Sequence, residues 1–194
     1  MFILTTFSDL VVIHPQDFSK PTSEAIEDEI NAKYANKVVY NIGLCICLFD
    51  VLKVSEGLIG YGNGSANVHV TFRLIVFRPF KGEILTGRIS SSTPAGINVR
   101  LDFFEDILIP GHLLFDGCVF DIKENVWVWH SEGTELYMDK GEIIRFKVEN
   151  EKFTDQTPVN PMVAKAEVAS FHKEPPYQIN ASCSAAGLGL VAWW

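Results

Sequence analysis

The sequence predicts an α+β protein with two β-rich parts: a β-α-β-β unit followed by a small β-barrel. Apolar alternation typical of strands runs through most of the chain, and one helical pattern interrupts it near the N-terminus. At Arg78-Pro79 a proline ends a long strand, and shorter strands follow. A chain of 194 residues, 47% hydrophobic and 21% charged, is globular and long enough for one large or two small domains. We therefore predict domains at 1–78 and 79–194.

The first elements are a long strand and a helix. Residues 2–13, FILTTFSDLVVI, are apolar and β-branched, which predicts a strand. Residues 21–34 begin with Pro, Thr and Ser, carry acids in the early turns, and place Ile26, Ile30 and Tyr34 four residues apart. This pattern predicts a helix with an apolar side and a solvated acidic face.

Two further strands and a turn complete the first part. Residues 38–54 are apolar at nearly every position, which predicts a strand buried on both faces. Residues 67–77 alternate, with Val68 through Val76 inward at every second position. The stretch GYGNGS, 60–65, superficially resembles a phosphate-binding loop. Since neither a helix pattern nor a Lys-Ser/Thr pair follows it, a hairpin turn is favoured.

The second part is predicted to contain five short strands of a barrel. They are residues 82–90, 96–101, 106–110, 142–150 and 164–172. Residues 116–141 interrupt this spacing and are predicted to be an insertion, with Trp127 and Trp129 on one side of a hairpin. Local packing of these tryptophans is favoured over a ligand platform.

A basic segment stands out in a chain whose net charge is -8. Residues 73–100 carry five basic side chains and one acid, Glu83. Alternation turns Ile97 and Val99 inward and leaves outside the barrel a polar set: Arg88, Asn98, Arg100, Arg145 and Lys147. Such a face suits phosphate contact, and the alternatives are ordinary surface charge or a subunit interface. For Arg73, Arg78 and Lys81, near the expected domain joint, a structural ion-pair role is favoured.

Catalytic and metal-binding patterns are weak. The five histidines and four cysteines have no metal-ligand spacing, and no Ser or Cys lies in a nucleophile-elbow context. Solvated surface explains Asp102, Glu105 and Asp106 as well as acid–base chemistry does. We expect no enzyme activity, metal or cofactor. The chain has no apolar run of membrane-spanning length and no signal-peptide pattern, and its cysteines favour a reducing compartment, cytosol or nucleus.

Several long motifs resemble one family. The segment VTFRLIVFRPFKGEILTGRIS, 70–90, following NIGLCICLFD and GNGSANV, resembles the joint between the two domains of RNA polymerase stalk subunits. The resemblance covers almost the whole chain. The opening MFILTTFSDLVVIHP, the segment NAKYANKVVYNIGLCIC, the insertion around Val126 to His130 and the terminus GLGLVAWW resemble the larger stalk subunit of RNA polymerase III.

The resemblance implies a tip domain of RNP-like type and an OB-fold barrel of S1-motif type. It implies a non-catalytic nuclear stalk subunit that pairs with a smaller stalk subunit, docks on the RNA polymerase III core, aids initiation, including that of tRNA transcription, and contacts nascent RNA and initiation factors. The outer polar set would bind RNA, and Leu58, Ile59 and Tyr61 in the glycine-rich turn would dock on the core. The alternative is a free-standing OB-fold RNA-binding protein of translation or RNA processing, and a hydrolase built on the first domain is a remote third.

The barrel departs from RNA-binding relatives in one respect. Where such barrels often carry an aromatic on the second strand and a histidine on the third, this chain has Gly96-Ile97 and Ile109-Pro110. The departure favours contact with the RNA backbone over base stacking.

Overall fold

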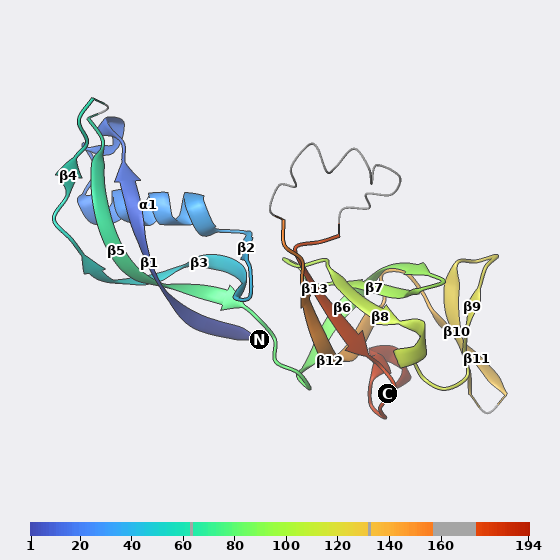
Figure 1. The fold of residues 1–194 in the computed structure, drawn as a ribbon. Helices are drawn as coiled ribbons and strands as arrows, with labels where there is room; N and C mark the ends of the chain where they lie inside the picture. The colour runs from blue at the N-terminus through green and yellow to red at the C-terminus, as the bar shows by residue number, and fades with distance from the viewer. Residues whose placement is uncertain (63, 132, 157–173) are drawn as a thin grey trace. The chain divides into compact units, whose positions relative to one another are not determined.

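The computed structural model describes residues 1–62, 64–131, 133–156 and 174–194, and the chain folds into two compact units, Met1–Arg78 and Pro79–Trp194. Strands dominate both units, and α1 is the one α-helix among these residues (Figure 1). The predicted α+β class is confirmed. No helix among them is both long and apolar enough to cross a membrane.

The first unit is an antiparallel sheet with a helix across one face (Figure 1). The strands lie in the order β1-β5-β3-β2, and β4 pairs with β5. The elements are β1 (Phe2–Ile13), η1 (Pro15–Asp17), α1 (Thr22–Tyr34), β2 (Lys37–Val39), β3 (Gly43–Val54), β4 (Leu58–Ile59) and β5 (Ala66–Phe77). The predicted first strand and helix are therefore confirmed.

The core of this unit lies between α1 and the central strand β5. Every inward position predicted for β5, from Val68 to Val76, is buried. Ile26 and Ile30 of α1 are buried in the same cluster. Fully burying a side chain of this size contributes about 1.5–3 kcal/mol relative to leaving it exposed. The buried side chains that alternate along β5 and repeat every four residues along α1 therefore hold the two elements together.

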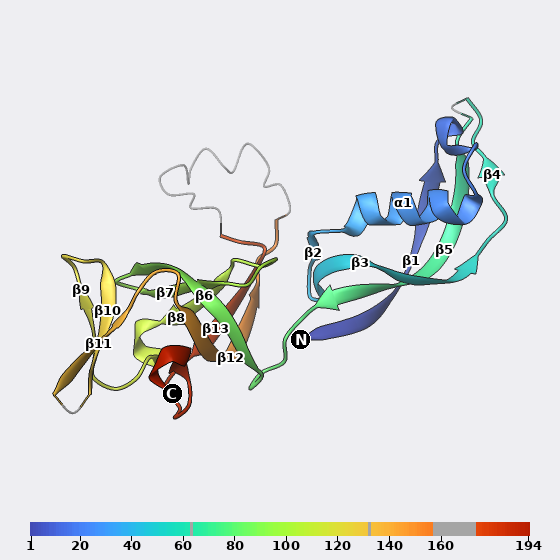
Figure 2. The ribbon, with the colours of Figure 1, turned by 180° about the vertical axis from the view of Figure 1, so that it is seen from behind.

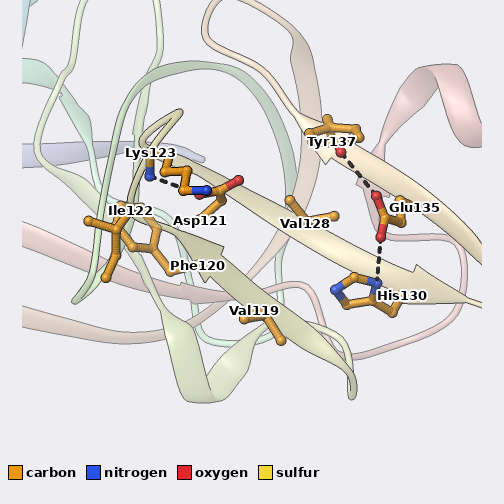
Figure 3. A pocket seen from close by; sticks show the side chains of 9 residues that line it. All are labelled: Val119, Phe120, Asp121, Ile122, Lys123, Val128, His130, Glu135 and Tyr137. Atoms are coloured by element: carbon orange, nitrogen blue, oxygen red, sulfur yellow. Dashed lines mark hydrogen bonds and ion pairs between the residues drawn. The ribbon is translucent and has the colours of Figure 1, made fainter.

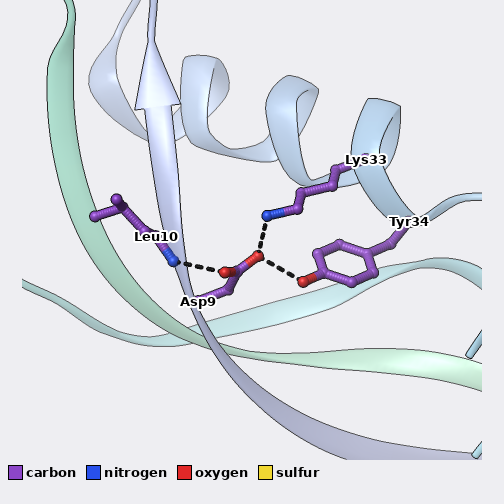
Figure 4. A network of polar contacts seen from close by, with 4 residues as sticks. All are labelled: Asp9, Leu10, Lys33 and Tyr34. Carbon is purple, nitrogen blue, oxygen red and sulfur yellow. Dashed lines mark hydrogen bonds and ion pairs between the residues drawn. The ribbon is translucent and has the colours of Figure 1, made fainter.

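A polar network fastens the C-terminal end of α1 to β1 (Figure 4). One carboxylate oxygen of Asp9 accepts hydrogen bonds from Lys33 and Tyr34, and the other accepts from the backbone N–H of Leu10 at 2.8 Å. Burial raises the pKa of Asp9, but these hydrogen bonds outweigh it, so the pKa is lowered. Burial and then the bond to Asp9 raise the pKa of Tyr34 to about 12.

The prediction of one strand over residues 38–54, buried on both faces, is wrong. A turn separates β2 from β3: Asn41 has a φ of +59°, and the Ile42 N–H donates to the Val39 carbonyl at 3.0 Å. β2 then folds back to pair with β3. Within β3 the apolar Phe49 is more than half exposed, because α1 covers one face of the sheet and three register shifts break the strand's alternation.

The second unit is a barrel with a smaller sheet attached (Figure 2). Its main sheet has the order β13-β8-β7-β6-β12-β14, and the additional pairing of β13 with β12 closes five strands into the OB-like barrel. The elements are β6 (Ile84–Thr93), β7 (Gly96–Arg100), β8 (Ile107–Pro110), η2 (Gly111–Leu113), β9 (Cys118–Asp121), β10 (Val126–Ser131), β11 (Thr134–Met138), β12 (Ile143–Phe153), β13 (Tyr177–Ser182), β14 (Gly189–Leu190) and η3 (Val191–Trp193).

The fifth barrel strand among the described residues is β13, which the sequence prediction missed. The strand predicted at 164–172 lies outside the described residues. β13 pairs in parallel with β8 and antiparallel with β12. Its own alternation was the available signal, because Tyr177, Ile179 and Ala181 are fully buried. Pro175 and Pro176, directly before it, were a second signal, because prolines commonly bound a strand.

The insertion forms the three-stranded sheet β11-β10-β9. Trp127 is buried, and its indole N–H donates to the Thr93 carbonyl at 2.9 Å. Trp129, on the same side of β10, stacks on Phe115 with ring centroids 4.7 Å apart. Both tryptophans therefore pack locally, as the sequence favoured, and attach the insertion to the barrel.

Candidate nucleic-acid and docking surfaces

Three arginines lie together on the outer face of the barrel. Arg88 of β6 is directly opposite Arg100 of β7 in the strand register. β12 lies on the other side of β6. Its Arg145 is opposite Thr86, which is two residues from Arg88 and on the same face of β6. All three arginines are exposed, whereas the flanking Ile89 and other alternate residues of these strands are buried. The alternation predicted for these strands is confirmed.

The positive charge of these arginines is not neutralised within the described part of the chain, where none of the three forms an ion pair. Arg88 and Arg145 each donate one hydrogen bond to a backbone carbonyl, of Gly141 at 3.4 Å and of Gly187 at 3.3 Å. A guanidinium has five N–H donors, so most remain available to a ligand.

The other two members of the polar set already have partners. Lys147 forms an ion pair with Glu149 at 2.6 Å. The side-chain amide of Asn98 donates to Ser91 Oγ at 3.0 Å. Both residues are half-buried on the outer side of their strands. The strongest anion-binding arrangement in this set is thus the arginine trio Arg88, Arg100 and Arg145.

The positions where related barrels often carry stacking residues are part of the core. Ile97 and Ile109 are opposite each other in β7 and β8, and both are fully buried. These side chains cannot receive a base on the outer face. This supports backbone-directed contact.

The basic residues of the first unit have structural contacts. Arg73 makes a two-pronged hydrogen bond to Asp50, and this bond lowers the pKa of that carboxyl. The predicted ion-pair role is confirmed for Arg73. Arg78 donates to the Asn41 carbonyl at 2.8 Å, and Lys81, in the second unit, is exposed.

The glycine-rich segment is a hairpin turn, as predicted. The Gly60 N–H donates to the Ser65 carbonyl at 2.8 Å, and β5 follows directly. Leu58 and Ile59 are both 73% exposed on the edge strand β4, and Tyr61 in the turn is fully exposed. These three residues therefore leave apolar surface uncovered at one end of the sheet.

Within the described residues, no group of three or more His, Cys, Asp or Glu side chains is arranged to hold a metal. Burial raises the pKa of Cys45 and Cys118 to about 11 and that of Cys183 to about 12. These thiols therefore stay protonated near neutral pH, where a nucleophilic cysteine would be a thiolate.

Comparisons with known proteins agree with this two-unit structure. Residues 83–194 match the family model of RNA polymerase III subunit Rpc25, and residues 8–64 match the SHS2 domain found in the N terminus of Rpb7p, Rpc25p and MJ0397. Over its full length the chain is 52% identical to DNA-directed RNA polymerase III subunit rpc8 of Schizosaccharomyces pombe and 43% identical to RPC8 of Saccharomyces cerevisiae, covering 100% of both. It is 45% identical to RPC8 of Bos taurus, covering 98% of that protein.

Proposed function

This chain belongs to the family of RNA polymerase III subunit Rpc25, and we propose that it is a non-catalytic stalk subunit of nuclear RNA polymerase III. It forms a heterodimer with a smaller stalk subunit, docks on the polymerase core, aids initiation and contacts nascent RNA. The observation that carries the proposal is similarity along the entire chain to proteins named as subunits of that enzyme. Residues 1–78 are the tip domain, and 79–194 are the barrel with an insertion near 116–141.

The arginine trio supports RNA contact by the barrel. Within the described residues these exposed guanidinium groups have no acidic partner, which suits phosphate oxygens, and phosphate contacts give affinity with little sequence preference. Arg88 and Arg100 carry most of this contact, and Arg145 extends it. Asn98 and Lys147 contribute less, because each would have to give up an existing partner.

The exposed turn supports docking by the tip domain. Leu58, Ile59 and Tyr61 expose apolar surface beside a short edge strand, where burial against another protein would be favourable. We assign the contact with the polymerase core to this turn.

Purification of the tagged chain from its native cells tests the proposal. Mass spectrometry of the material should identify a polymerase-sized complex containing RNA polymerase III subunits and a smaller stalk subunit. A monomer bound only to RNA would instead indicate the alternative, a free-standing OB-fold RNA-binding protein. Detection of RNA polymerase I or II subunits in its place would contradict the polymerase class.

A further inference from the structure

The insertion sheet carries a hollow that residues of β9, β10 and β11 line (Figure 3). Its volume is about 400 Å³. Three apolar side chains form its floor: in the strand register, Val128 of β10 is opposite Val119 of β9 on one side and Tyr137 of β11 on the other. The hollow is thus built from all three strands, across the middle of the sheet.

The two faces of this sheet have different roles. Trp127 and Trp129 are on one face and hold the sheet to the barrel. On the opposite face Val128 is only 5% exposed, but its neighbours Val119 and Tyr137 are 56% and 40% exposed. Apolar side chains at this exposure have surface left to bury against a partner.

Two acids, Asp121 and Glu135, line the hollow beside the apolar floor, together with Lys123 and His130. One carboxylate oxygen of Glu135 accepts a hydrogen bond from the Tyr137 hydroxyl at 3.1 Å (Figure 3). The other lies 3.7 Å from Nδ1 of His130. That hydrogen bond raises the pKa of Tyr137, and the charges of Glu135, Glu124 and Asp121 raise it further. Three carboxylates therefore act on one side chain of the floor.

The charge of the whole insertion has the same sign. Residues 116–141 contain six acids and two lysines. The insertion and the arginine trio belong to the same unit but favour opposite ligands, since a net negative charge repels phosphates and attracts cations.

We propose that this hollow binds an extended segment of a partner protein in which one large apolar side chain is flanked by lysine or arginine. The apolar side chain of the partner packs against Val119, Val128 and Tyr137 on the floor of the hollow. The flanking cations of the partner face Asp121 and Glu135. A volume of about 400 Å³ lies within the range of pockets that bind specific groups. The inference does not depend on the proposed function, because it concerns a surface of this chain alone.

Fluorescence anisotropy tests the inference, with the full-length chain purified together with its co-expressed smaller partner. The probe is a synthetic labelled peptide, Gly-Lys-Arg-Phe-Lys-Arg-Gly, compared with one peptide carrying Ser for Phe and another carrying Glu for every Lys and Arg. The Phe peptide should bind at least about tenfold more tightly than either, which corresponds to ~1.4 kcal/mol.

Two variants assign the site. Val119→Ser and Glu135→Lys should each weaken the Phe peptide several-fold. Glu27→Lys on α1 is the matched charge control, because Glu27 is exposed on the other unit. It should bind the peptide like the wild type. Equal loss in Glu27→Lys and Glu135→Lys would reduce the binding to general attraction by an acidic protein and overturn the inference.

Should a variant fail to fold, chemical-shift mapping on the wild-type chain, isotope-labelled within the co-expressed pair, decides the matter. Amide shifts confined to β9, β10 and β11 on adding the Phe peptide support the site, and shifts elsewhere overturn it. Equal affinity for the Ser peptide, or displacement by short oligouridine, would also overturn it. None of these measurements uses the polymerase, so their failure is distinguishable from failure of the stalk assignment.

Discussion

Arg88 and Arg100 lie directly opposite each other across two antiparallel strands, both exposed and neither in an ion pair within the described residues. Like charges directly opposite each other destabilise a sheet. A sheet surface selected for stability alone would place an acid opposite an arginine. The pairing leaves two guanidinium groups to a negatively charged partner, and the proposed partner is RNA phosphate.

Replacing both arginines should change the salt dependence of RNA binding. In the Arg88→Glu/Arg100→Glu variant, the slope of log affinity against log salt should fall by ~0.7 for each lost phosphate contact. The fold should survive, because both side chains are outside the core. Binding of single-stranded RNA by the purified heterodimer across a salt series measures the slope, with circular dichroism as the folding check.

Lys147→Gln is the matched control for that experiment. Since Lys147 is already paired with Glu149, its loss should change the slope less than the loss of either arginine. An unchanged slope and affinity in a folded double arginine variant would return Arg88 and Arg100 to ordinary surface or interface charge.

Removing the apolar surface of the glycine-rich turn should weaken docking. Replacing Leu58, Ile59 and Tyr61 by Ser should reduce retention of the stalk on the polymerase in salt washes while leaving the heterodimer intact. Tyr40→Ser is the control, because Tyr40 is an exposed aromatic in the turn between β2 and β3. The start of β3 that follows this turn pairs with the end of β5 opposite to the glycine-rich turn. Equal retention of the triple variant and the wild type would refute the assignment.

The sequence patterns predicted the elements that depend on local alternation. β5, α1 and the outward arginines follow directly from spacing. The turn between β2 and β3 was missed because the apolar residues on both sides of it suggested one continuous strand, although Asn41 and Gly43, which both have positive φ, are turn-type residues. The burial of β3 on both faces also failed, since it depends on whether a second layer covers the sheet.

In the candidate site, the pairing of Arg88 with Arg100 needed the register of two strands, which spacing alone does not determine. The Lys147–Glu149 ion pair had a usable signal, because positions i and i+2 of a strand share a face. The hollow of the insertion had none, because it arises from how three short strands pair and curve. Whether the site residues bind RNA or the core remains a prediction.

The chain should need its smaller partner for solubility. Besides the apolar residues of the glycine-rich turn, it leaves Phe49 and Leu52 of β3 more than half exposed, together with Trp194 at the terminus. Apolar surface left uncovered promotes self-association. Expressed alone, the chain should elute as aggregates in size-exclusion chromatography and melt at a lower temperature than the co-expressed pair. A soluble monomer as heat-stable as the pair would contradict this.

The Asp9 network should make the first unit lose stability at both ends of the pH scale. The pKa of Asp9 is lowered by folding, so its contribution is present above the usual carboxyl pKa and is lost as the pH falls through the folded-state value. The pKa of Tyr34 is raised to about 12, so its contribution is present below the ordinary tyrosine pKa of about 10 and declines as the pH rises above it.

Asp9→Asn should cost about 1 kcal/mol near neutral pH and flatten the acid limb of the curve of unfolding free energy against pH. Tyr34→Phe should flatten the alkaline limb. Asp28→Asn is the control, since its ion pair with Lys20 is exposed and should contribute little. Urea unfolding followed by far-ultraviolet circular dichroism measures the effect, because α1 belongs to this unit whereas all four tryptophans follow Pro79. An acid limb of the same slope in Asp9→Asn and the wild type would show that another carboxyl controls acid stability.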